Sequence, residues 1–224
     1  MIKGAVRLDG KYSDQTRMAA EEEMRILVDE WKRLGRIPKD SRPPWLQSCG
    51  PATAAMGAWG AGYEVDIPLP GGAILPGEDA ANWYFNDPDN DAEMQAAVRW
   101  HFYDDKGQRK QEMPDNRQPA LYPLMAQRVW GAKCAVKWNV PRDHVRYMLS
   151  QLERNRPLQV CLPGHYVLID RWNTAIEEFG GKDPWRGRRP GAGPGMWYTD
   201  AEINSIGREY MIIWLPRGDD GSGV

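Results

Sequence analysis

The stretch Trp45-Leu46-Gln47-Ser48-Cys49-Gly50-Pro51-Ala52-Thr53-Ala54-Ala55-Met56-Gly57-Ala58-Trp59 decides the fold of the chain. It follows Pro43-Pro44, which favours an extended lead-in, and becomes an alanine-rich, helix-favouring run after Pro51. Proline suits the first turn of a helix, because its missing N–H would have no partner there. We therefore predict that a helix starts at Pro51 and that Cys49 lies at or just before its N-terminus.

A cysteine in this position is a candidate nucleophile. The free backbone N–H groups at a helix start and the positive end of the helix dipole both favour the thiolate, which is the nucleophilic form. The alternative is that Cys49 is a buried apolar side chain, as a lone cysteine commonly is. The loop-to-helix position favours the nucleophile, since Gly50 allows close approach of another backbone.

Length, composition and charge limit the class of protein. The chain has 224 residues, of which 42% are hydrophobic, and this is enough for one domain with a substantial core. The net charge of −2 predicts no nucleic-acid partner. No apolar run is long enough to cross a bilayer, and the segment Met1-Ile2-Lys3-Gly4-Ala5-Val6-Arg7 lacks the apolar core of a secretory signal. We expect a monomer that is made in the cytoplasm and does not insert into membranes.

The cysteines and histidines leave few possible catalytic arrangements. Cys49, Cys134 and Cys161 are odd in number and widely spaced, which argues against both a disulfide framework and a zinc site. We predict no metal and no cofactor. Of the three histidines, His101 and His144 lie within expected helices and are interpreted as structural or solvated.

The pattern along the chain predicts an α+β fold. Helical periodicity and helix-stop residues predict helices over 16–34, 51–60, 92–102, 121–130 and 140–155. Runs of apolar and β-branched residues predict strands over 132–138, 157–162, 165–172 and 210–215. Residues 63–92 are rich in Pro, Gly, Asp and Asn and predict a long surface loop. Helices that precede a run of strands are typical of the α+β class.

We expect a single domain over residues 1–224. Residues 1–44 form its N-terminal helix and lead-in, residues 45–217 its catalytic core, and residues 218–224 a flexible tail. Within the core, the strands over 157–162 and 165–172 flank a Pro-Gly turn, and this predicts an antiparallel hairpin.

A nucleophilic cysteine needs a general base, and the base needs a partner that orients its ring. His165 follows Gly164 at the start of a strand, where its side chain can face a cleft; a half-buried structural histidine is the alternative. Asp183 precedes Pro184 after an expected strand and can reach back to the imidazole, although an Asp-Pro turn would have the same sequence. Asp170 is discounted, because five residues along one strand place it on the opposite face from His165.

Acyl transfer also requires hydrogen-bond donors for the oxyanion. The backbone N–H of Cys49 is one candidate. Gln47 is the nearest side-chain amide and is the predicted second donor, with Ser48 as a weaker alternative.

Three segments of the chain resemble papain-like cysteine peptidases. They are residues 45–59, 160–172 and 182–187, which contain the motifs Gln-Ser-Cys-Gly-Pro-Ala, Gly-His-Tyr-Val-Leu-Ile-Asp and Asp-Pro-Trp. More narrowly, they resemble the double-glycine (bacteriocin-processing) peptidase superfamily and its phage-borne relatives, many of which are predicted cell-wall hydrolases. The resemblance implies a papain-like α+β fold, with the cysteine on a central helix of an N-terminal helical half that packs on a C-terminal antiparallel sheet.

In this family the cysteine starts the central helix, the histidine starts a strand, and the aspartate precedes a proline at a strand end. Cys49, His165 and Asp183 occupy those positions. The chain departs from the family at the oxyanion glutamine, which commonly lies six residues before the cysteine. Pro43 stands at that position here, whereas Gln47 lies two residues before the cysteine.

The leading functional hypothesis is a thiol-dependent peptidoglycan hydrolase, an endolysin-like endopeptidase of phage type that acts on the cell wall after release. The resemblance implies this substrate. One alternative is a cysteine protease that processes a leader peptide or a host protein. Another is a papain-like protein without turnover that binds a partner through its tryptophan-rich region. The sequence leaves the scissile bond open, because amidase and endopeptidase activity need the same three residues.

Overall fold

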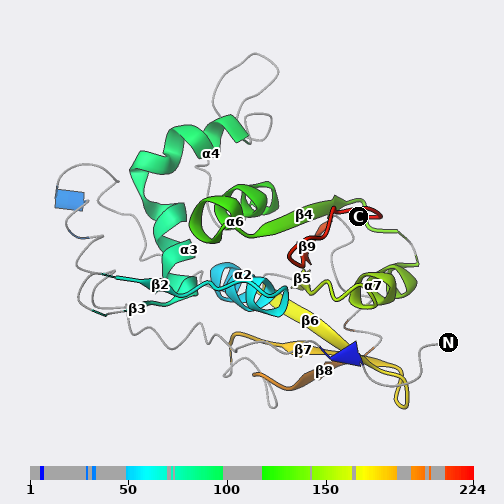
Figure 1. The fold of residues 1–224 in the computed structure, drawn as a ribbon. Helices are drawn as coiled ribbons and strands as arrows, with labels where there is room; N and C mark the ends of the chain where they lie inside the picture. The colour runs from blue at the N-terminus through cyan, green and yellow to red at the C-terminus, as the bar shows by residue number, and fades with distance from the viewer. Residues whose placement is uncertain are drawn as a thin grey trace.

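The computed structural model of the protein describes residues 6–7, 29, 32–33, 49–69, 72, 74–97, 118–141, 143–162, 165–185, 193–199, 202 and 210–224. Five α-helices and one large antiparallel sheet make up most of this part of the chain (Figure 1). The predicted α+β class is thereby confirmed.

In the described part of the chain, the large sheet contains seven strands. Six follow one another across it in the order β4 (Lys133–Trp138), β9 (Tyr210–Leu215), β5 (Leu158–Leu162), β6 (His165–Asn173), β7 (Glu178–Lys182) and β8 (Met196–Tyr198), and β1 (Val6–Arg7) pairs with β6. All these pairings are antiparallel. The predicted hairpin is confirmed, since Leu162 of β5 lies opposite His165 of β6. The last strand, β9, lies between β4 and β5 and so joins the two parts of the sheet.

The helices and short elements have the following bounds. The α-helices are α2 (Cys49–Gly60), α3 (Gly77–Asn86), α4 (Asp91–Ala97), α6 (Tyr122–Trp130) and α7 (His144–Leu152). The 3-10 helices are η3 (Pro88–Asn90) and η4 (Pro119–Leu121), and β2 (Ile67–Pro68) pairs with β3 (Ile74–Leu75) in a second small sheet. No helix in the described ranges has the length and apolar character that crossing a membrane requires.

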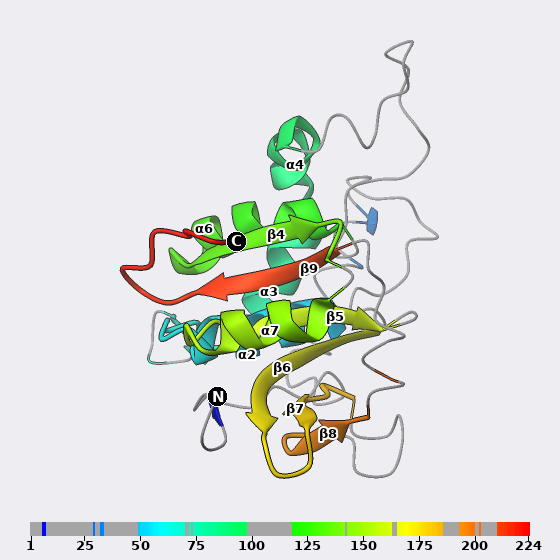
Figure 2. The ribbon, with the colours of Figure 1, turned by 90° about the vertical axis from the view of Figure 1, so that its right-hand side faces the viewer.

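Helices cover both faces of the large sheet. Ile212 and Trp214 of β9 belong to a core with α2, α3 and α6, whereas Met211 and Ile213 belong to a second core with α7. This alternation follows from the two-residue period of a strand. Figure 2 shows α2 and α7 on either side of β5 and β6.

Helix α2 is buried along most of its length. Every residue from Gly50 to Ala58 is buried, so the helix is central rather than a surface element. Its approach to the sheet depends on Gly57, because a Cβ there would lie 2.4 Å from the Trp214 indole. The close contact between helix and sheet sets where the N-terminus of α2 meets β5 and β6.

The prediction of a long surface loop over 63–92 is wrong. This segment contains α3, η3 and the β2–β3 pair. Ala81, Tyr84 and Phe85 of α3 are buried in the same core as α2, and this burial outweighs the turn-forming composition. Acidic residues in the first turn of α3 complement the helix dipole.

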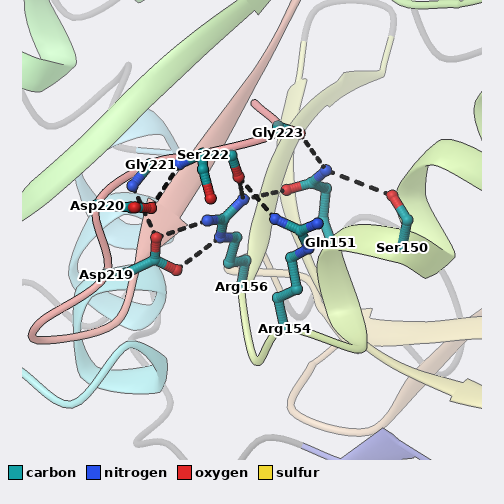
Figure 3. A network of polar contacts seen from close by, with 9 residues as sticks. All are labelled: Ser150, Gln151, Arg154, Arg156, Asp219, Asp220, Gly221, Ser222 and Gly223. Carbon is teal, nitrogen blue, oxygen red and sulfur yellow. Dashed lines mark hydrogen bonds and ion pairs between the residues drawn. The ribbon is translucent and has the colours of Figure 1, made fainter.

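Residues 218–224, expected to form a flexible tail, make specific polar contacts with the rest of the chain. Arg156, whose side chain is 2% exposed, donates to the Asp219 carboxylate at 2.7 and 2.5 Å and to the Ser222 carbonyl at 3.0 Å (Figure 3). Gln151 of α7 accepts a further hydrogen bond from Arg156 at 3.0 Å. These contacts hold the chain end against α7 and the turn that follows it.

The expected N-terminal helix over 16–34 falls almost entirely outside the described residues. Within it, Asp29, Lys32 and Arg33 are described and are helical. The helix expected over 92–102 begins at Asp91 and is described as far as Ala97.

Candidate active site

Cys49 is the first residue of α2 and is partly exposed. Pro51 lies in the first turn, as the sequence predicts. Gln159 of β5 anchors this helix start, because its Nε2 donates to the Gly50 carbonyl at 3.2 Å. Its Oε1 accepts from the Trp214 indole at 3.3 Å, so both halves of the fully buried amide are used. The sequence analysis missed Gln159; a polar residue inside the apolar strand 158–162 was the available clue.

His165 is the first residue of β6, and its side chain is 6% exposed. Its Nε2 lies 2.8 Å from Oδ1 of Asp183 and donates to that carboxylate. The Cys49 thiol lies close enough to the same imidazole to act on it electrostatically and to contribute to its raised pKa. Because Nε2 is engaged by Asp183, the nitrogen left for the thiol is Nδ1.

Asp183 directly follows β7 and is fully buried. Its backbone N–H donates to the Gly193 carbonyl at 2.9 Å, which ties the end of β7 to a returning segment of the chain. Its Oδ1 accepts a second hydrogen bond, from the backbone N–H of Trp185 at 2.9 Å. Asp183 is thus held in place by hydrogen bonds of both its backbone N–H and its carboxylate.

The electrostatic environment favours a charged imidazole. Burial lowers the pKa of His165, but the hydrogen bonds and charges of Asp183 and Cys49 outweigh burial, and the net effect raises the pKa of His165 above its usual value. The buried Asp183 carboxylate therefore favours the protonated form of the imidazole beside Cys49.

Trp185 borders this group of residues. Its ring lies edge-on to the His165 imidazole, with centroids 6.2 Å apart and planes at 64°. The side chain is 43% exposed, so it presents an aromatic surface to solvent beside the imidazole.

The structure does not bring Asp170 to the imidazole. Its carboxylate is buried and lies 2.8 Å from Nζ of Lys182 and 3.4 Å from Nε of Arg171. The β6–β7 pairing is irregular between Ile169 and Arg171, and Asp170 lies at this irregularity. The Asp170 carboxylate therefore forms an ion pair with Lys182 rather than an interaction with His165.

The remaining sequence candidates lie elsewhere. Cys134 is buried in β4, and burial raises the pKa of its thiol. Cys161 is half-buried in β5, with Sγ 3.2 Å from the Leu162 carbonyl oxygen. His144 starts α7 and is buried. Gln47, Ser48 and His101 lie outside the described residues, so the predicted oxyanion role of Gln47 stays a prediction.

No protein-family model matches the chain, and no curated protein sequence matches it significantly. Among the residues that the structure describes, no group of three or more His, Cys, Asp or Glu side chains is arranged to hold a metal ion. The chemical interpretation therefore rests on the geometry around Cys49 and on the sequence motifs.

Proposed function

We propose that the protein is a papain-like, cysteine-dependent hydrolase of amide bonds. One observation carries the proposal: the His165 imidazole is hydrogen-bonded to the buried Asp183 carboxylate and lies close enough to the Cys49 thiol for the thiol to affect its pKa. A nucleophile, a base and a group that orients the base are the parts that general-base-assisted acyl transfer requires. The three residues lie at a helix N-terminus and at two strand ends, which are the positions expected from the family that the sequence motifs resemble.

Acylation follows from this geometry. His165 Nδ1 accepts the proton of the Cys49 thiol, and the sulfur attacks the carbonyl carbon of the substrate amide. The imidazolium then gives its proton to the leaving nitrogen as the C–N bond breaks. The products of this step are a free amine and a thioester on Cys49.

Deacylation returns the site to its starting state. His165 takes a proton from water as the oxygen attacks the thioester carbon, and the Cys49 sulfur leaves and is reprotonated. Throughout, Asp183 keeps Nε2 as the hydrogen-bond donor, holds Nδ1 toward the thiol and stabilises the imidazolium. The backbone N–H of Cys49, at the helix start, is the proposed oxyanion donor, with Gln47 as the proposed second.

For the substrate we propose peptide bonds in peptidoglycan, as in a phage lysin-like endopeptidase. The resemblance of the three motifs to phage-borne cell-wall hydrolases supports this choice. A protein substrate such as a leader peptide would use the same three residues, so the substrate is decided by experiment.

The test uses purified full-length protein, with Cys49→Ala as its matched control. Both are incubated with bacterial cell walls and with purified peptidoglycan, and the soluble products are analysed by mass spectrometry. We expect new amino termini in the peptide fraction with the wild type and none with Cys49→Ala. Labelling of Cys49 by an active-site thiol probe without cleavage of walls would overturn the peptidoglycan substrate but not the hydrolase, whereas failure of both would overturn the hydrolase.

A further inference from the structure

Arg171 of β6 contacts both segments that hold Asp183. Its Nη2 donates to the Gly181 carbonyl at 2.5 Å and to the Pro194 carbonyl at 2.9 Å. Gly181 lies two residues before Asp183 on β7. Pro194 follows Gly193, whose carbonyl accepts the backbone N–H of Asp183. One guanidinium nitrogen therefore bridges the two pieces of backbone between which Asp183 lies.

The space for this bridge comes from missing side chains on β7. A Cβ at Gly180 would lie 2.5 Å from Cγ and 2.6 Å from Nε of Arg171. The same Cβ would lie 2.7 Å from the Trp197 ring in β8, and the guanidinium lies 5.7 Å from the centre of that ring. Arg171 is thus enclosed between its own strand, β7 and β8, and its side chain is only 13% exposed.

The Arg171 guanidinium belongs to a small group of charged side chains. Asp170 lies 3.4 Å from Nε of Arg171, and Lys182 of β7 pairs with the other oxygen of Asp170 at 2.8 Å. Asp170, Arg171 and Lys182 thus form one group of charged side chains that links β6 and β7. Hydrogen bonds from a charged donor are about twice as strong as neutral ones, so the two carbonyl contacts are suited to fixing the local backbone.

We infer that Arg171 is a positioning residue that holds the Gly181 and Pro194 carbonyls together and thereby keeps the Asp183 carboxylate against His165. Arg171 contacts the backbone before and after Asp183 in space and acts through that residue. The inference rests on the proposed function for its effect on turnover, but its effect on the imidazole does not depend on any substrate.

The experiment compares Arg171→Lys and Arg171→Gln with Arg128→Gln. Arg128 is an exposed arginine of α6 that is hydrogen-bonded to Glu93 at 2.7 Å, so its replacement is the same chemical change far from the site. The first readout is the pKa of His165, titrated by NMR in full-length protein that carries Cys49→Ala, which removes the coupled thiol. The second is kcat and KM in protein that retains Cys49.

We expect both Arg171 variants to lower the pKa of His165, because a displaced Asp183 no longer opposes the effect of burial. We also expect kcat to fall about tenfold with little change in KM, and Arg128→Gln to change neither quantity. Lysine keeps the positive charge beside Asp170 but lacks the rigid guanidinium group that places one nitrogen between both carbonyls. A thermal melt shows whether Arg171→Gln is folded. If it is unfolded, the Arg171→Lys variant tests the inference.

Folded Arg171 variants with an unchanged pKa of His165 and unchanged kcat would overturn the inference. A lowered pKa of His165 in a protein that cleaves no amide would uphold Arg171 and overturn the proposed function. Arg171 variants with normal turnover and an unchanged pKa of His165 would overturn the inference about Arg171 and uphold the proposed function.

Discussion

His165 Nε2 lies 2.8 Å from Oδ1 of Asp183, and both side chains are buried. A hydrogen bond shielded from water keeps one nitrogen of the imidazole occupied, so the ring cannot turn without giving up a buried hydrogen bond to a carboxylate. The ring orientation at Cys49 is therefore a property of the folded chain before any substrate binds.

The first prediction concerns the nucleophile. Cys49→Ala is expected to abolish turnover with little change in melting temperature, because the side chain is small and partly exposed at a helix start. Cys161→Ala should retain most activity, as should Cys134→Ser if it folds. Turnover is measured on cell-wall peptides with each variant. Near-normal activity in Cys49→Ala, beside loss in Cys161→Ala, would refute the assignment.

The second prediction concerns reactivity. Iodoacetamide near neutral pH should modify Cys49 ahead of Cys134, since Cys49 is partly exposed at a helix start whereas Cys134 is buried and burial raises the pKa of its thiol. Peptide mapping after partial modification identifies the labelled cysteine. Chelators should leave turnover intact, and EDTA inhibition that zinc reverses would contradict a thiol mechanism.

The third prediction concerns stability and pH. The pKa of His165 is raised in the folded state, so the folded chain binds this proton more tightly than the unfolded chain does. The resulting stabilisation is complete below the unfolded value of about 6.5 and is lost as the pH rises through the folded value. Denaturant unfolding of the wild type and His165→Gln from pH 5.5 to 8.5 measures it. The difference between their unfolding free energies should shrink as the pH rises across that window. A difference that grows with pH would contradict the prediction.

Part of the site follows from sequence because its residues stand at local landmarks. Cys49 precedes the proline of a helix start, His165 begins a strand, and Asp183 precedes Pro184 after another strand. Each landmark is a matter of neighbouring residues, so periodicity and turn chemistry were sufficient to propose all three. Their mutual contacts were still unknown, since strand register and the packing of α2 decide them.

The features that were missed depend on contacts distant in sequence. Arg156 and Asp219 are 63 residues apart, and neither position alone suggests an ion pair. The composition around α3 is typical of loops, but Ala81 and Phe85 bury against the core and make the helix stable. Gln159 likewise gains its role only when β5 meets the start of α2.

The fourth prediction concerns the chain end. Asp219→Asn should lower the free energy of unfolding by about 2 kcal/mol at neutral pH, because it leaves the buried Arg156 guanidinium without its charged partner (Figure 3). Asp220→Asn is the matched control, since Asp220 accepts a hydrogen bond from the Ser222 backbone but lies outside the ion pair. Equal stability of the Asp219 and Asp220 variants would mean that the ion pair contributes little.

The last prediction separates the two aspartates. Asp183→Ala should reduce kcat by about tenfold to ten-thousandfold, because the imidazole loses the partner that fixes its orientation. Asp183→Asn should be milder, since an amide oxygen still accepts from Nε2. Asp170→Ala should mainly reduce stability, because it leaves Lys182 buried without its carboxylate.

Turnover and thermal melts of the three variants distinguish these roles. A folded Asp183→Ala with full activity, beside a folded but inactive Asp170→Ala, would transfer the orienting role to Asp170. That outcome would require Asp170 to exchange Lys182 for His165 during the reaction. The irregular β6–β7 pairing next to Asp170 is where such a shift would have to begin, yet the 2.8 Å ion pair opposes it. We therefore expect the loss of activity to follow Asp183.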